Sequence, residues 1–225
     1  ELKRSFRGYI LRTVGRFRSR IHSWDVINEA HHWANELDFD GEQLLEVTRL
    51  AAETTRVADP TAFRVVNSCL PWGEYVAFGR AANGRPVKRP ARTPLQYYKA
   101  LEDARVPYEA IGVQVYYPGY DMLEIERQIE RFFAFRKPIH ITELGLPSSS
   151  EGIKGGGPIP YNRVWHGTEW SQEIQADWVE QFYTLCYSKE EIQAVSYWYF
   201  SDSHGRTGSM GLVGFDFRPK QAYLR

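Results

Sequence analysis

Two glutamates, Glu29 and Glu143, are the side chains of this sequence best placed to do chemistry. Each follows a short apolar stretch, SWDVIN (23–28) or IHIT (139–142), at the point where that stretch ends. Two carboxyl groups that face one cleft can hold different pKa values, one protonated and one ionised. Such a pair suits cleavage of a glycosidic bond, in which one carboxyl protonates the leaving oxygen and the other attacks the anomeric carbon or activates water. A single glutamate at a strand end is more often a capping or ion-pair residue, so the interpretation depends on the pair.

Further polar side chains lie at the ends of the apolar stretches. They are Asn28, Asn67, Gln114, Tyr116, Ser201 and Asp202. A carboxylate buried alone is unfavourable, whereas one that borders a cleft has polar neighbours. We therefore expect these residues to share one polar site with the two glutamates.

The apolar stretches alternate with segments of helical period. Strands are expected at 22–28, 63–68, 110–117, 138–143 and 194–200, and helices at 2–21, 41–57, 93–106, 121–135 and 171–187. Thr93, Pro94 and Gln96 predict a capping box, and Asp121 with Glu124 predicts another. The alternation predicts an α/β fold with a parallel sheet, either doubly wound or a (β/α)8 barrel. A barrel brings its strand ends to one face, and no glycine-rich phosphate loop supports the doubly wound alternative.

Composition bounds the class of protein. The chain has 225 residues, 43% of them hydrophobic, and we expect one domain over residues 1–225. Its 28 basic and 28 acidic residues leave no charge excess that would indicate nucleic acid, and no run of about 20 apolar residues would cross a membrane. The first residue is Glu and no secretory leader follows, so we expect a processed chain or a piece of a longer one.

Five motifs resemble, in the same order, those of family-10 glycoside hydrolases, the endo-β-1,4-xylanases. WDVINEA (24–30) resembles the acid/base motif and IHITELG (139–145) resembles the nucleophile motif. IGVQVYY (111–117) resembles the intervening strand, YWYFSD (197–202) the final strand, and GLVGFDFRPKQAY (211–223) the chain end. The resemblance extends from residue 16 to residue 223. It implies a (β/α)8 TIM barrel in which this chain supplies about strands 4 to 8 and lacks the first three.

The same resemblance implies a retaining endo-β-1,4-xylanase that hydrolyses internal bonds of xylan by double displacement, without a metal or an organic cofactor. Glu29 would be the acid and base, and Glu143 the nucleophile. Five further residues would bind the sugar or orient Glu143: Asn28, Asn67, Gln114, Tyr116 and Trp198. The expected partners are xylan or xylo-oligosaccharides, and a missing N-terminal barrel segment or a partner chain that completes the fold. Because polymeric xylan cannot enter a cell, we expect an extracellular location.

The sequence departs from the family pattern at several positions, including the segment SDSHGRTG (201–208), which lacks the usual Trp after the final-strand Asp. Tyr116 stands where the family usually has His, and Gly145 stands where it usually has Asp. A tyrosine can still donate a hydrogen bond to the nucleophile, but the change keeps open a retaining glycosidase that acts on another β-linked glycan. The lack of the first three strands keeps open a non-catalytic carbohydrate-binding or structural barrel fragment.

The aromatic residues outside the strands have two possible roles, sugar binding or packing. Trp72 and Tyr75 would either stack on a sugar ring or pack within their loop. The long loop 144–170, with Trp165 and Trp170, would form a wall of the cleft or a structural insertion.

Histidines and cysteines are expected to have no chemical role. His31 and His32 are expected at the rim of the cleft rather than around a metal, and His140 is expected to face the helices. Cys69 and Cys186 are expected at opposite ends of the barrel, too far apart for a disulfide.

Overall fold

The computed structural model describes residues 1–30, 35–68, 71–80, 86, 91–116, 119–151, 153, 164–202 and 208–225. Its centre is a five-stranded sheet of order β1-β2-β3-β4-β7 in which all neighbours are parallel. The strands are β1 (Ser23–Asn28), β2 (Phe63–Asn67), β3 (Ala110–Tyr116), β4 (Ile139–Gly145) and β7 (Ile192–Tyr197). The strand order never reverses, whereas a doubly wound sheet reverses at a switch point. The sheet is therefore an arc of a barrel, as the second of the two sequence alternatives predicts.

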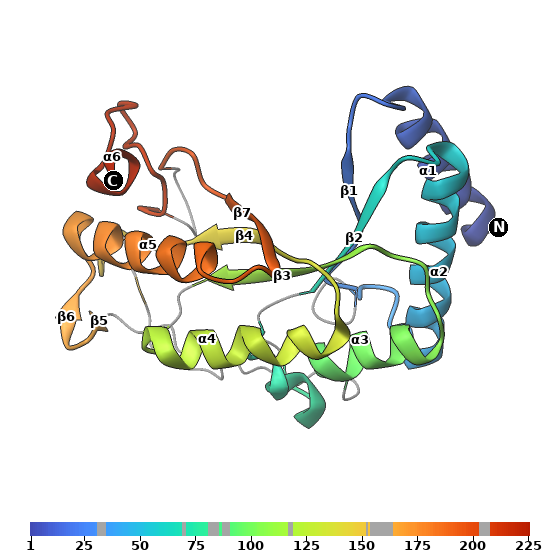
Figure 1. Ribbon diagram of the computed structural model, residues 1–225, viewed down its shortest axis with the longest axis horizontal. Helices are drawn as coiled ribbons and strands as arrows, with labels where there is room; N and C mark the ends of the chain where they lie inside the picture. The colour runs from blue at the N-terminus through green and yellow to red at the C-terminus, as the bar shows by residue number, and fades with distance from the viewer. Residues whose placement is uncertain are drawn as a thin grey trace.

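Helices alternate with the strands and cover the outer face of this arc. They are α1 (Leu2–Arg16), α2 (Gly41–Ala58), α3 (Pro94–Asp103), α4 (Met122–Glu130), α5 (Gln172–Tyr187) and α6 (Gln221–Leu224). In Figure 1, α1 and α2 lie together beside β1 and β2 at one end of the sheet, and α5 and α6 lie near β7 at the other. Short 3-10 turns, η1 (Glu74–Phe78) and η2 (Arg131–Phe135), and a small hairpin of β5 (Val164–Trp165) and β6 (Thr168–Glu169) complete the elements.

Local sequence signals set most helix starts. The predicted capping box at Thr93 is confirmed: its hydroxyl accepts the Gln96 N–H at 3.2 Å, and the Gln96 side chain accepts the Thr93 N–H at 2.9 Å. Asp121 also caps α4, by accepting the Glu124 N–H at 2.8 Å. The predicted return hydrogen bond, from the Asp121 N–H to the Glu124 side chain, is wrong. The Glu124 carboxylate instead accepts from Gln128 Nε2 at 2.6 Å. Each such cap stabilises its helix by about 1 kcal/mol.

Several element boundaries differ from the sequence prediction, including those of the first helix, the helix expected over 121–135 and the last strand. The first helix ends at Arg16 rather than at residue 21, because Ser19 adopts a left-handed φ of 60° and donates its N–H to Asp59 at 2.8 Å. The helix expected over 121–135 becomes 3-10 after Glu130. The last strand begins at Ile192, two residues before the expected start, and Ile192 pairs with Ile139 of β4.

The main core lies between the outer face of β2, β3 and β4 and helices α3, α4 and α5. Its largest fully buried apolar side chains include Tyr97, Tyr98, Phe132, Trp178 and Phe182. The four loop aromatics with two sequence interpretations, Trp72, Tyr75, Trp165 and Trp170, also belong to this core and are 4–7% exposed. They pack within the protein rather than lining an open surface.

His140 does not face the helices, so that expectation is wrong. Ile139 and Ile141, which alternate with it on β4, are the residues that enter the main core. The His140 ring stacks on Phe63 with centroids 5.4 Å apart, and Phe63 stacks in turn on His22 at 5.8 Å. Strict alternation back from Glu143 predicts the opposite orientation, but the register of β4 shifts between Ile141 and Leu144.

The sheet has two open edges in the described part of the chain, where β1 pairs only with β2 and β7 pairs only with β4. Large apolar side chains next to β7 remain exposed, including Trp198 at 56% and Phe200 at 60%. Unpaired strand edges and exposed apolar groups are typical of surfaces that another segment covers. None of the helices in the described ranges is long and apolar enough to cross a membrane.

Candidate active site

The strand register brings the predicted site residues to one end of the sheet. Asn28 of β1 pairs with Asn67 of β2, and Gln114 of β3 pairs with Glu143 of β4. Irregularities in register occur just before these residues in β1, β3 and β4. Such bulges re-aim side chains near the end of a strand, and they are common beside active sites. Four neighbouring strands, β1 to β4, therefore deliver polar groups to the same edge, as the sequence predicts.

Glu143 is held by three neutral donors. Gln114 Nε2 donates to its Oε1 at 2.9 Å, and Asn67 Nδ2 donates more weakly to the same oxygen at 3.4 Å. Tyr116 Oη donates to the other oxygen, Oε2, at 2.5 Å. The Glu143 side chain is 7% exposed, so these donors replace most of its hydration. A carboxylate with donors on both oxygens is fixed in orientation.

A network of side-chain amides joins Asn28 to this cluster. The Oδ1 of Asn28 accepts from Asn67 Nδ2 at 2.8 Å and from Gln114 Nε2 at 3.4 Å. Thr142 Oγ1 donates to Asn67 Oδ1 at 2.7 Å, which fixes the Asn67 amide. Thr142 is a site residue that was not predicted from the sequence, although its place directly before Glu143 is a signal for it. Asn28 itself is exposed, and its side-chain oxygen Oδ1 already accepts from protein donors.

Glu29 directly follows Asn28 and has an unusual backbone conformation. Its φ is 55°, in the left-handed region that non-glycine residues rarely adopt. Its N–H donates to the Asn67 carbonyl at 3.0 Å, and its side chain is buried with 6% exposed. A left-handed conformation at such a residue costs about 1–3 kcal/mol and often accompanies function. The chain accepts this cost at the residue that sequence analysis selects as a catalytic carboxylate.

Opposing effects act on the charge of Glu143. Burial is the largest, and it raises the pKa of this carboxyl above its ordinary value. The hydrogen bonds from Tyr116 and Asn67 lower it, while the negative charges of Glu29 and Asp25 raise it further. The pKa of Tyr116 is raised in turn, mainly by burial and then by its bond to Glu143. Tyr116 therefore stays protonated and remains a donor, and the negative charge of Glu29 raises the pKa of Glu143.

Trp198 lies directly after β7, beside the strand that carries Glu143. Its N–H donates to the Leu144 carbonyl at 2.8 Å, and its side chain is 56% exposed. The next residue, Tyr199, places its ring 6.3 Å from the ring of Tyr116. An exposed indole next to the glutamate cluster is suited to stacking on the apolar face of a sugar.

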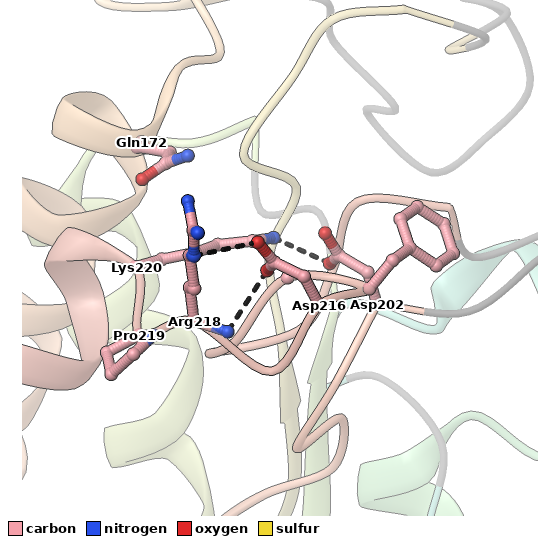
Figure 2. Close-up of a pocket in the computed structure, with 8 residues that line it drawn as sticks. Gln172, Asp202, Asp216, Arg218, Pro219 and Lys220 are labelled. Atoms are coloured by element: carbon pink, nitrogen blue, oxygen red, sulfur yellow. Dashed lines mark hydrogen bonds and ion pairs between the residues drawn. The ribbon is translucent and has the colours of Figure 1, made fainter.

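Asp202, a strand-end candidate in sequence analysis, has a structural partner instead. Figure 2 shows Lys220 bonded to Asp202 in the wall of a cavity of about 400 Å³, at 2.6 Å between Nζ and Oδ1. The cavity is lined by Gln172, Asp202, Gly214, Phe215, Asp216, Arg218, Pro219 and Lys220, and neither Glu29 nor Glu143 lines it. Lys220 also donates to Ser148 Oγ at 2.8 Å. This ion pair joins the segments after β4 and β7 to the C-terminal segment.

Other sequence expectations fall partly outside the described residues. His31, His32, Cys69 and residues 154–163 of the long loop lie there. Cys186 is buried and carries a free thiol. Among the residues that the structure describes, no three His, Cys, Asp or Glu side chains are grouped to hold a metal ion.

Comparison with known proteins identifies the relatives of this arrangement. Residues 1–224 match glycosyl hydrolase family 10. The chain is 23% identical to endo-1,4-beta-xylanase B of Thermotoga neapolitana, covering 100% of this chain and 60% of that protein. It is 26% identical to an endo-1,4-beta-xylanase of Geobacillus stearothermophilus, covering 97% of this chain and 66% of that protein.

Solved structures agree with the arc of parallel strands. The fold resembles native xylanase 10B of Thermotoga maritima with a TM-score of 0.71 at 22% identity, over 100% of this chain and 64% of that one. The chain thus has the fold of a partial (β/α)8 barrel, and it spans about two thirds or less of the length of these relatives. From the match over residues 1–224, the chain belongs to glycosyl hydrolase family 10.

Proposed function

We propose that this chain holds the catalytic pair of a retaining endo-β-1,4-xylanase, with Glu29 as acid and base and Glu143 as nucleophile. The observation that carries the proposal is the set of neutral donors on both oxygens of Glu143. Hydrogen bonds to a carboxylate favour its ionised form, which is the form that attacks an anomeric carbon. A carboxylate that is buried, oriented and close to a second carboxyl fits this role better than a capping role.

The two glutamates would share the work of double displacement. Glu143 attacks the anomeric carbon while Glu29 gives its proton to the leaving oxygen, which produces a covalent glycosyl-enzyme. Glu29 then removes a proton from a water molecule that attacks the same carbon and releases Glu143. Once Glu143 is an ester its negative charge is gone, so Glu29 no longer faces that repulsion when it ionises.

The distance between the two carboxyl groups distinguishes the possible mechanisms. Retaining enzymes hold them roughly 5–5.5 Å apart, and inverting enzymes roughly 6.5–9.5 Å. We predict the shorter distance in the assembled site.

The amides and aromatic groups around the pair would bind the sugar. The side-chain oxygen of Asn28, Oδ1, accepts hydrogen bonds from Asn67 and Gln114. These bonds orient the exposed side-chain amide so that its Nδ2 is the group available to a sugar hydroxyl. Asn67, Gln114 and Tyr116 would position Glu143, and Trp198 would stack on the sugar ring at the cleavage point. A hydrogen bond that tightens as the transition state forms raises the rate rather than only the affinity.

Two parts of the proposal concern the surroundings of the site. The open edges of β1 and β7 support the presence of an N-terminal barrel segment or a partner chain that completes the cleft. A polymeric substrate such as xylan, or shorter xylo-oligosaccharides, supports action outside the cell. Tyr116 keeps another β-linked glycan as the second candidate substrate.

The direct test is release of reducing ends from β-1,4-xylan by the protein that contains this chain, with Glu143→Gln as the inactive control. Loss of turnover in the variant supports the proposal, and unchanged turnover refutes the role of Glu143. Turnover of a different β-glycan, but not of xylan, supports the second substrate. Affinity for xylan without turnover by the native protein supports a non-catalytic carbohydrate-binding protein.

A further inference from the structure

Gly145 lies on β4 two residues after Glu143 and is paired in register with Tyr116 on β3. We propose that Gly145 is a positioning residue for Glu143, because only the absence of a side chain there lets the Tyr116 ring reach the Glu143 carboxylate. This inference rests on the proposed role of Glu143. It assigns a function to a residue that would never contact the substrate.

The space at Gly145 is the first observation that supports this proposal. A Cβ atom at residue 145 would lie 2.7 Å from Cε1 and 2.9 Å from Cδ1 of Tyr116, and 2.8 Å from Cε of Met210. Real Cβ atoms essentially never approach another heavy atom to under 3.0 Å. Gly145 is not among the residues with positive φ, so its backbone does not require glycine. Glycine is therefore required by the Tyr116 ring and not by the conformation of the chain.

The hydrogen bond that the ring makes is the second observation. Tyr116 Oη donates to Glu143 Oε2, whereas Gln114 and Asn67 both donate to Oε1. An alanine at 145 would push the ring away from the β4 backbone. The Met210 side chain is flexible and can give way, but the ring is rigid and its hydroxyl would move with it. Oε2 would then lose the donor that helps keep Glu143 ionised and oriented.

Gly145→Ala should therefore reproduce the effect of Tyr116→Phe on catalysis. Both changes remove a hydrogen bond to a charged group, which corresponds to roughly a 10- to 100-fold lower kcat. Both should also move the acid limb of the kcat/KM profile to higher pH, because the Tyr116 hydrogen bond lowers the pKa of Glu143 and its loss would raise that pKa. A purely structural effect of alanine would not move that limb.

Combining the two changes separates the chemical effect from the steric one. Once Tyr116→Phe has removed the hydroxyl, adding Gly145→Ala should reduce kcat by little more, because the same bond is already lost. The phenylalanine ring still occupies the same space, so the loss of thermal stability from Gly145→Ala should persist. Equal and independent losses of kcat in the two backgrounds would overturn the proposal.

A variant with a smaller side chain keeps the test decisive if Gly145→Ala folds poorly. Tyr116→Leu removes the ring, so Gly145→Ala should lower the Tm less in that background than in the native one. An equal loss of Tm in both backgrounds would overturn the steric coupling without any activity measurement. Gly41→Ala, at the start of α2, is the matched control, since the three atoms nearest to a Cβ there all belong to the Arg92 side chain, at 2.9–3.2 Å. It should leave kcat and the pH profile unchanged.

Failure of this inference is distinguishable from failure of the proposed function. If Glu143→Gln keeps its turnover, the proposed function fails and the Gly145 variants carry no meaning for catalysis. If Glu143→Gln is inactive but folded Gly145→Ala keeps the native kcat and pH profile, only the role of Gly145 is refuted.

Discussion

Replacing Lys220 with methionine should lower the free energy of unfolding by about 3–5 kcal/mol, because it removes one partner of a buried ion pair. The Lys220 side chain is 5% exposed and that of Asp202 is 9% exposed. Lys220 Nζ bonds to Asp202 Oδ1 at 2.6 Å, to Ser148 Oγ at 2.8 Å and to the Ser209 carbonyl at 3.2 Å. In the variant, the Asp202 carboxylate would keep the N–H of Gly211, at 2.8 Å, as a partner but would lose its counter-charge.

Thermal unfolding followed by circular dichroism measures this effect. In a domain of this size, 1 kcal/mol corresponds to about 2–4 °C, so the Tm should fall by about 6–20 °C. Lys99→Met is the matched control, because Lys99 and Asp103 form an ion pair whose side chains are 70% and 65% exposed. It should change the free energy of unfolding by less than about 1 kcal/mol.

A second variant tests the cause. Asp202→Leu combined with Lys220→Met removes both buried charges, and it should recover much of the lost stability. A Tm for Lys220→Met that matches the Tm of Lys99→Met would refute the reasoning. It would mean that the segments after β4 and β7 are held to the C-terminal segment by packing alone.

Three further predictions concern the candidate site. Burial raises the pKa of Glu143 in the folded protein above the ordinary 4.5, so its ionised form destabilises the fold at neutral pH. The Tm of Glu143→Gln should therefore exceed the native Tm at pH 7. This difference in Tm should shrink as the pH falls below the raised pKa toward 4.5. Glu29→Ala should slow xylan cleavage roughly 100- to 10,000-fold, but should slow the first step much less with an aryl glycoside whose leaving group needs no proton, as pre-steady-state kinetics would measure. Trp198→Ala should raise the KM for xylo-oligosaccharides roughly 2- to 10-fold with less effect on kcat, and an unchanged KM would remove Trp198 from the sugar-binding surface.

The sequence predicts the membership of the candidate site better than its geometry. Glu29, Asn67, Gln114 and Glu143 are recognisable because a polar residue that follows an apolar strand is easy to detect. The parallel arrangement then brings such residues to one edge, whichever helices cover the sheet. The α/β class and the parallel sheet follow from the same alternation, which leaves the strand order open between a doubly wound sheet and a barrel.

The details that the sequence does not predict depend on contacts between distant segments. The left-handed backbone of Glu29 and the shifted register of β4 have no local signal, and the wrong orientation of His140 follows from that shift. Trp72 lies in a loop after a strand, a position that suits a sugar-binding surface, yet tertiary packing buries its side chain. Asp202 has the pattern of a site residue, but its partner Lys220 lies 18 residues further along the chain.

Trapping of the glycosyl-enzyme tests the central claim most directly. A 2-fluoro xylobioside with a good leaving group reacts with a retaining enzyme but slows the release step, so the covalent intermediate accumulates. Peptide mass spectrometry of the trapped protein should find one sugar attached to Glu143, and no label should form in Glu143→Gln. A label on another residue, or full turnover of xylan by a protein that never becomes labelled, would contradict the account.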